Sequence, residues 1–146
     1  MDRTRIHHIG IVVFDRARMQ DFLEIFHFEI DREEYVEAYH AQCVFTKHND
    51  REVALEFVIP DSGPLVEFNQ GKGGLHHIAL EVDDVEAVRQ EYTEKGRLML
   101  EEHAVQGACG ILVNFLRPRY GAGILGQHRT IVSAAFAQSF APSVQL

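Results

Sequence analysis

The chain contains an internal repeat, and this repeat limits the folds that it can adopt. Residues 6–13 (IHHIGIVV) resemble residues 75–82 (LHHIALEV), and an acidic turn follows each segment, at Asp15 in the first copy and at Asp83 and Asp84 in the second. A repeated order of elements indicates that one supersecondary unit is present in several copies. We therefore expect two copies of one module within the 146 residues.

A helical pattern follows each acidic turn. Apolar side chains recur at helical spacing over residues 19–26 and again over residues 85–92. Asp15 and Asp84 are predicted N-caps, because a short carboxylate can accept hydrogen bonds from the free amides of a first helical turn. Gly96 fits the end of the second helix.

Strand-like segments follow each predicted helix. Residues 42–47 and 53–59 are predicted to pair around a turn at 48–50, and residues 111–116 and 123–127 are predicted to form the corresponding pair around a turn at 117–121. The sequence predicts an α+β fold of two βαβββ modules. We place the modules at residues 1–60 and 75–130, with a linker at 61–74 and a tail at 131–146 that has no counterpart in the first copy.

Composition excludes several classes of partner. The chain has 22 acidic and 14 basic residues, a formal charge of −8, and no clustered basic face of the kind that binds nucleic acid. Its apolar runs are too short to span a membrane. Cys43 and Cys109 lie far apart, which argues against a disulfide framework or a thiolate zinc site. We expect a soluble, cytoplasmic protein.

Three polar side chains fall on the faces of strands that point away from the helices. Side chains alternate along a strand, so His8 lies opposite the apolar face of its strand, and His77 does the same in the second copy. Glu56 lies between Ala54 and Val58, where a carboxylate is costly unless it has a partner. Two histidines and a carboxylate suggest a divalent metal site. The alternative is that both histidines are hydrogen-bonded core residues and that Glu56 lies at an edge.

The motifs resemble those of a known family. The segment 73–84 (GGLHHIALEVDD) is similar to the methylmalonyl-CoA epimerase branch of the glyoxalase/vicinal oxygen chelate superfamily. The similarity extends to residues 6–8 (IHH), 55–60 (LEFVIP), 115–119 (FLRPR) and 121–125 (GAGIL), and it covers roughly residues 5–127.

The resemblance implies a mixed, cupped sheet of the glyoxalase type around one divalent ion, which could be Co, Zn, Ni, Mn or Fe. The ligand positions that it implies are His8, Glu56, His77 and Gln127. Related epimerases and glyoxalases usually carry glutamate at the fourth position, where this chain has Gln127. An amide oxygen can bind a cation, but it cannot accept a proton as a carboxylate can. The resemblance also implies a homodimer.

The resemblance leaves four functions open. The first is a metal-dependent isomerase or epimerase acting on a carbon α to a carbonyl, with a small-molecule substrate such as an acyl-CoA and with Glu56 and Gln127 as the catalytic candidates. The alternatives are a glyoxalase-type lyase, a non-catalytic binding protein, which the loss of a carboxylate favours, and an Fe(II) dioxygenase. His40 is a further candidate base. Arg117 and Arg119 could attract an anionic group of the substrate, although solvated surface arginines are the simpler interpretation.

Overall fold

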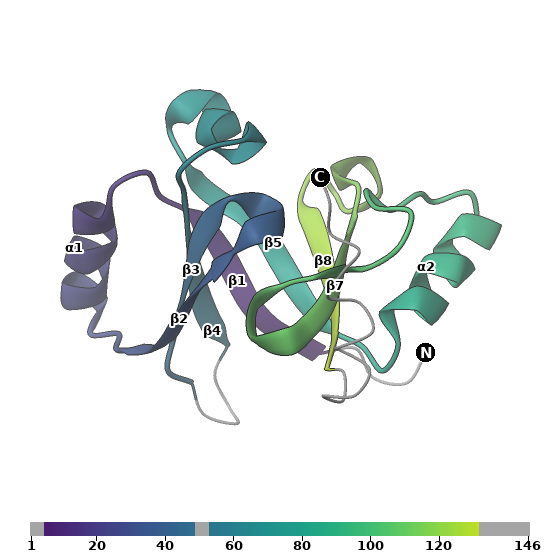
Figure 1. Cartoon of the computed structure of the whole chain (residues 1–146), viewed down its shortest axis with the longest axis horizontal. Helices are drawn as coiled ribbons and strands as arrows, with labels where there is room; N and C mark the ends of the chain where they lie inside the picture. The colour runs from purple at the N-terminus through teal and green to yellow at the C-terminus, as the bar shows by residue number, and fades with distance from the viewer. Residues whose placement is uncertain (1–4, 49–52, 132–146) are drawn as a thin grey trace. The chain divides into compact units, whose positions relative to one another are not determined.

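The structure is a computed structural model that describes residues 5–48 and 53–131 (Figure 1). The chain divides into two compact units, residues 8–76 and residues 1–7 together with 77–146. Most of the turn predicted at residues 48–50 and almost all of the tail predicted at 131–146 lie outside the described residues.

The first unit follows the predicted order of elements. They are β1 (Arg5–Val12), α1 (Arg16–Phe26), β2 (Ile30–Val36), the 3-10 helix η1 (Glu37–Tyr39), β3 (Ala41–Thr46) and β4 (Ala54–Pro60). The strands lie in the order β2-β3-β4-β1, in which β1 is parallel to β4 and the other neighbours are antiparallel. The 3-10 helix η2 (Pro64–Gly71) lies in the segment predicted as a linker and precedes the second unit.

The second unit repeats this topology. Its elements are β5 (Gly74–Glu81), α2 (Val85–Glu94), β6 (Val105–Gln106), the 3-10 helix η3 (Ala108–Gly110), β7 (Ile111–Leu116), the 3-10 helix η4 (Pro118–Tyr120) and β8 (Leu125–Ile131). The strands lie in the order β5-β8-β7-β6, and β5 is parallel to β8. Two βαβββ modules with mixed strand directions confirm the predicted glyoxalase-like α+β class.

Each helix begins at the predicted cap and buries one face against its own sheet. The Asp15 carboxylate accepts a hydrogen bond from the amide of Ala17 at 2.8 Å. Met19 and Leu23 of α1 are buried against Phe57 of β4. In α2 the Asp84 carboxylate accepts from the amides of Glu86 and Ala87, at 2.9 and 3.2 Å. Capping of this kind satisfies amides that the first turn leaves without helical partners.

Two strands lack a sequence signal that could have located them. The charged run DREE lies inside β2, where all five central residues are exposed, so the apolar alternation of a half-buried strand is missing. β6 has two residues, too few for any periodicity. A third strand, β8, runs from Leu125 to Ile131 and so extends beyond the segment predicted at 123–127. The polar residues after Gln127 lie inside this strand, although a polar run usually indicates the end of one.

The Glu86 side chain joins α2 to the segment that follows it. Its carboxylate accepts hydrogen bonds from the amide of Ala104 and, at 2.9 Å, from the side chain of Arg89. Burial alone would raise the pKa of Glu86, but the hydrogen bonds from Ala104, Arg89 and His103, together with the charge of Arg89, outweigh it and hold the pKa below its ordinary value.

Replacing Glu86 by glutamine should therefore lower the free energy of unfolding by about 1 kcal/mol, less than a buried charged hydrogen bond contributes, because the side chain is partly solvated. The folded-state pKa of Glu86 is depressed, so its contribution is present above the unfolded pKa of about 4.3 and is lost as the pH falls below it. Urea unfolding at pH 7 and pH 4 measures both effects. Glu91→Gln, which breaks an exposed pair with Lys95, is the control and should cost clearly less, because solvent screens that pair. Equal losses in the two variants would contradict the role of Glu86.

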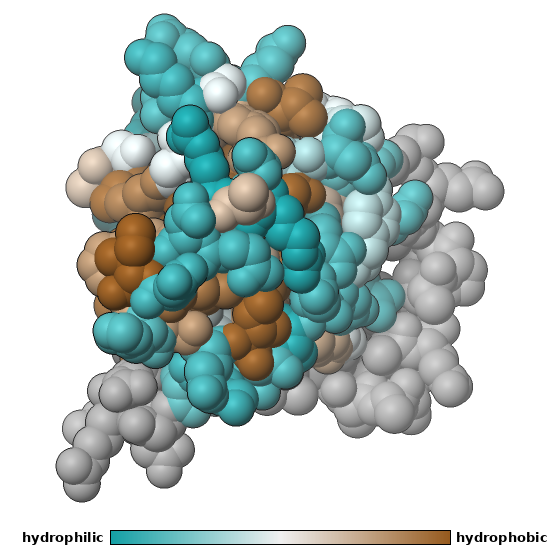
Figure 2. Space-filling view, turned by 90° about the vertical axis from the view of Figure 1, so that its left-hand side faces the viewer, coloured by the Kyte–Doolittle hydropathy of each residue, from teal (hydrophilic) through white to brown (hydrophobic). Residues whose placement is uncertain are grey.

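Several apolar side chains near the end of α1 remain exposed. Ile25 is 68% exposed and Phe26 is 57% exposed, and the ring of Phe22 lies 4.5 Å from that of Phe26. Figure 2 looks onto the α1 side of Figure 1 and shows apolar patches among polar side chains. No helix within residues 5–48 and 53–131 is long and apolar enough to cross a membrane.

Candidate metal centre

The β1–β4 register places His8 and Glu56 on one face of the first unit. Gly10 is paired with Glu56 and His8 with Ala54, and neighbours in register point to the same side of a sheet. The other face carries Leu55 and Phe57, whose side chains pack in the same core cluster as Met19 of α1. The expectation that His8 and Glu56 point away from the helix is confirmed.

His8 and Glu56 contact each other directly. The Nε2 atom of His8 lies 3.0 Å from a carboxylate oxygen of Glu56, and their side chains are only 3% and 7% exposed. The ring of Phe45 meets His8 edge-on at 5.3 Å, and Phe45 is also the register partner of Glu56 on β3. A buried carboxylate therefore lies next to a buried imidazole, and an aromatic ring packs against that imidazole.

The second unit contains the same arrangement, with a glutamine in place of the glutamate. His77 and Gln127 are buried, and Ala79, two residues after His77, is the register partner of Gln127 on β8. Phe115 meets His77 edge-on at 5.7 Å and is the register partner of Gln127 on β7. Gln127 therefore occupies in the second unit the position that Glu56 occupies in the first. Sequence reasoning missed both phenylalanines, although each lies in a predicted strand.

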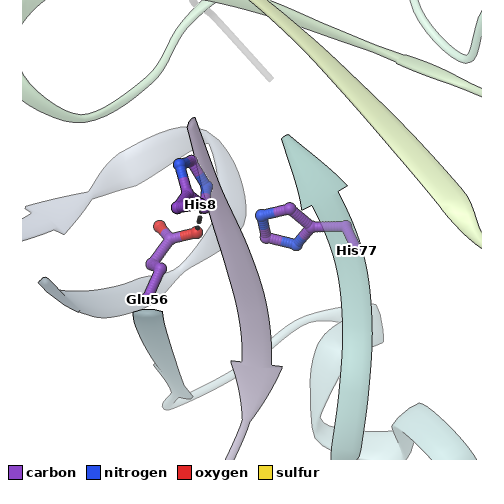
Figure 3. A group of neighbouring side chains, drawn as sticks. All are labelled: His8, Glu56 and His77. Atoms are coloured by element: carbon purple, nitrogen blue, oxygen red, sulfur yellow. Dashed lines mark ion pairs between the residues drawn. The ribbon is translucent and has the colours of Figure 1, made fainter. Parts of the chain in front are cut away.

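His8, Glu56 and His77 form a group that could hold a metal ion. One ligand atom from each residue lies within 4.8 Å of the others, and all three residues are buried (Figure 3). Two imidazoles and one carboxylate suit Zn, Co, Ni, Mn or Fe.

His128 follows Gln127 on β8 and points to the other face of the strand. Its Nε2 atom lies 3.0 Å from the Tyr92 hydroxyl of α2, and its Nδ1 atom lies 3.2 Å from the carbonyl oxygen of Gly126. Burial lowers the pKa of His128 below its ordinary value, so the neutral ring is favoured. The contact with α2 fixes the direction of Gln127 on the opposite face.

The remaining sequence candidates lie elsewhere. His40 is in a left-handed turn between η1 and β3, and its carbonyl oxygen accepts a hydrogen bond from the amide of Asp61. It is not a member of the metal-binding group found among the described residues. Arg117 and Arg119 are exposed around η4, where the Arg119 guanidinium lies 5.1 Å from the Tyr120 ring. One further charged residue, Arg129, is buried in β8 and was not singled out in the sequence.

Comparison with known proteins agrees with this architecture. The sequence profile of the Glyoxalase/Bleomycin resistance protein/Dioxygenase superfamily matches residues 7–115. The mitochondrial methylmalonyl-CoA epimerase of Bos taurus is 26% identical over 124 residues, which are 83% of this chain and 71% of that protein.

Solved structures agree as well. A methylmalonyl-CoA epimerase variant of Streptomyces coelicolor in complex with 2-nitronate-propionyl-CoA has a TM-score of 0.77 and 29% identity, over 88% of this chain and 98% of that one. A hypothetical protein of Bacillus halodurans has a TM-score of 0.81 and 27% identity, over 90% of this chain and 97% of that one.

Proposed function

This chain belongs to the Glyoxalase/Bleomycin resistance protein/Dioxygenase superfamily. On that basis we propose that it is a divalent-metal-dependent isomerase in which His8 and His77 bind the metal. The substrate that we propose is an acyl-CoA with an acidic hydrogen on the carbon α to the thioester carbonyl. The observation that carries this proposal is the buried group of His8, Glu56 and His77. The similarity to epimerases that act on acyl-CoA thioesters supports the substrate class.

The donor set fits a resident cation. His8 and His77 would each supply a neutral nitrogen, Glu56 would supply a charged oxygen, and Gln127 would supply an amide oxygen from the equivalent strand position. A divalent ion held there would polarise the thioester carbonyl and stabilise the negative charge that develops on its oxygen as the α-proton leaves.

Side chains of the protein would carry out the proton transfer. Glu56 is the carboxylate of the group, so it is the residue proposed to take a proton from the α-carbon and return it. The rings of Phe45 and Phe115 pack edge-on against His8 and His77 and would limit the access of water to the reacting carbon. Gln127 can orient a carbonyl or a ligand through its amide, but it cannot serve as a second base.

The test is solvent exchange. Metal-loaded protein incubated with methylmalonyl-CoA in deuterium oxide should add one mass unit at the α-carbon more quickly than the buffer alone. Protein treated with a chelator should match the buffer, and mass spectrometry follows both reactions. Exchange that survives complete removal of metal would contradict the proposed chemistry.

A non-catalytic binding protein is the second candidate. The observation that favours it is the amide of Gln127 in place of the customary carboxylate. Tight binding of methylmalonyl-CoA by metal-loaded protein, together with no exchange above the buffer rate, would establish this function and exclude the isomerase.

We also expect the chain to form a homodimer, because small paired-module chains of this kind often bury a helix face or a sheet edge against a second copy. The exposed apolar side chains of Ile25 and Phe26 are consistent with such burial. Sedimentation equilibrium at micromolar concentration should give twice the mass of 16.6 kDa. A mass of one chain at that concentration would contradict the prediction.

A further inference from the structure

An arginine of the first unit faces the same side of the sheet as His8 and Glu56. Arg32 of β2 is the register partner of Phe45 on β3, and Phe45 is the register partner of Glu56 on β4. Because register partners point to the same side of a sheet, these three side chains form a row across three strands. The proposed reaction assigns no role to Arg32.

A β-bulge turns Arg32 toward this side. Residues 30 and 32 would share a face in a regular strand, but the register of β2 against β3 shifts between Ile30 and Arg32. Ile30 therefore pairs with Thr46 and packs in the core under α1, whereas Arg32 pairs with Phe45. Bulges are frequent next to functional sites, where the extra residue re-aims a side chain. This bulge lets β2 supply an apolar side chain to the core and a cation to the opposite face.

The contacts of the neighbouring side chains agree with this direction. Glu33, the next residue of β2, points to the helix side, where its carboxylate accepts hydrogen bonds from Arg16 of α1 at 2.9 and 3.0 Å. The guanidinium carbon of Arg32 lies 5.0 Å from the centre of the Phe45 ring. The centre of the same ring lies 5.3 Å from that of His8. One aromatic ring therefore packs against both the cation and a proposed metal ligand.

The Phe45 ring holds the cation without consuming its hydrogen-bond donors. A guanidinium is attracted to the face of an aromatic ring by the quadrupole of the ring, and this contact uses none of its five N–H groups. Arg32 is exposed, so a ligand can reach it from solvent. The edge of a guanidinium binds carboxylate or phosphate oxygens through paired hydrogen bonds. Arg32 can therefore bind an anion at a place one aromatic ring away from His8.

We propose that Arg32 is a specificity-determining residue that binds an anionic group of the thioester substrate. The proposal rests on the proposed function for the acyl-CoA, and it adds a residue of the first unit that selects for negative charge. Methylmalonyl-CoA carries anionic groups in two places, the phosphates of the CoA and the carboxylate of the acyl group. Both present the same acceptor chemistry to a guanidinium.

Four thioesters test the contact and separate the two sources of charge. Methylmalonyl-CoA carries both kinds of anion, isobutyryl-CoA only the phosphates, methylmalonyl-pantetheine only the carboxylate, and isobutyryl-pantetheine neither. Calorimetry on metal-loaded protein should show that Arg32→Met weakens the binding of methylmalonyl-CoA about 10-fold, a modest loss for a charged hydrogen bond because solvent reaches the side chain. The same loss with isobutyryl-CoA assigns the contact to the phosphates, and the same loss with methylmalonyl-pantetheine assigns it to the carboxylate. The affinity for isobutyryl-pantetheine should not change.

Three further variants separate recognition from charge and structure. Arg18→Met removes an equal charge from an exposed position of α1 and should change the affinity less than about 2-fold. Arg32→Lys keeps the charge but loses the paired hydrogen bonds, so its affinity should be intermediate. Glu34 lies two residues beyond Arg32 on the same face of β2. Glu34→Gln should strengthen the binding of methylmalonyl-CoA, because it removes a negative charge that repels the anion.

Several results would overturn the proposal. They are an Arg32→Met variant that binds all four thioesters as the wild type does, an equal loss with isobutyryl-pantetheine, and an equal loss in Arg18→Met or Glu34→Gln. If Arg32→Met does not fold, Arg32→Lys takes its place and must show the same dependence on the anionic groups. Added sodium chloride should weaken the binding of methylmalonyl-CoA more in the wild type than in Arg32→Met, because salt screens an exposed charge pair.

These measurements follow binding and need no proton exchange, so they keep the role of Arg32 distinct from the proposed reaction. Binding that depends on Arg32 and on the anionic groups, without any exchange, would refute the isomerase and retain the role of Arg32. Exchange in the wild type together with unchanged binding in Arg32→Met would do the reverse. Wild-type protein that binds none of the four thioesters would refute both proposals.

Discussion

Replacing Gln127 by glutamate should raise the rate of α-proton exchange in methylmalonyl-CoA by about 10² to 10⁴, the usual range for general acid–base assistance. The physical reason is that Gln127 occupies the position in the second unit that Glu56 occupies in the first, opposite a phenylalanine on the neighbouring strand. A carboxylate there would give the site a second base. Mass spectrometry in deuterium oxide, at saturating metal and substrate, measures the ratio of the two rates.

The matched control is Gln127→Met, which removes the amide without adding a base and should not raise the rate. Glu56→Gln in the wild-type background should abolish exchange if Glu56 is the base. Rapid exchange in the wild type that survives Glu56→Gln would assign the proton transfer to another group. No exchange in either the wild type or Gln127→Glu, with metal and thioester both bound, would exclude the isomerase and favour the non-catalytic binding protein.

The second large effect concerns the metal itself. Wild-type protein should hold one divalent ion per chain after dialysis, and the double variant His8→Ala/His77→Ala should hold none. The double change removes both nitrogen donors from the group and leaves the Glu56 carboxylate alone. Elemental analysis by mass spectrometry measures the stoichiometry, and circular dichroism shows whether the variant keeps its fold.

Metal should also stabilise the wild type. An ion present at 1,000 times its dissociation constant adds about 4 kcal/mol to the free energy of unfolding, and the double variant should gain nothing. His103→Ala is the control, because His103 is an exposed histidine outside the group, and it should bind metal as the wild type does. Wild-type protein that purifies without metal and gains no stability from Zn²⁺, Co²⁺, Ni²⁺ or Mn²⁺ would disprove the centre.

The faces of the strands could be read from the sequence because alternation is a local property. His8, His77 and Glu56 each lie in short strands in which consecutive helix-facing positions carry apolar residues. Once the apolar face is assigned to the helix, the direction of the polar residue follows without knowledge of any partner strand. The structure keeps all three buried. The role of Gln127 came from family resemblance rather than from alternation, and it stays a prediction.

Features that depend on register could not be read in this way. The edge-on contacts of Phe45 with His8 and of Phe115 with His77 join residues on strands that are not neighbours in sequence. Their pairing is fixed by the sheet, and a shift of one residue would place each ring on the other face. The burial of Arg129 was also hidden, because a run of polar residues after Gln127 resembles the end of a strand rather than its interior.

A carboxylate at Glu56 and an amide at the equivalent Gln127 would decide the stereochemical course of the reaction. The α-carbon becomes planar when its proton leaves, and a proton returned to the side from which it came restores the original configuration. A site that works through Glu56 alone would therefore label one stereoisomer of methylmalonyl-CoA with deuterium faster than it produces the other. Gln127→Glu would supply a second carboxylate, so the ratio of inversion to deuterium labelling should rise in that variant.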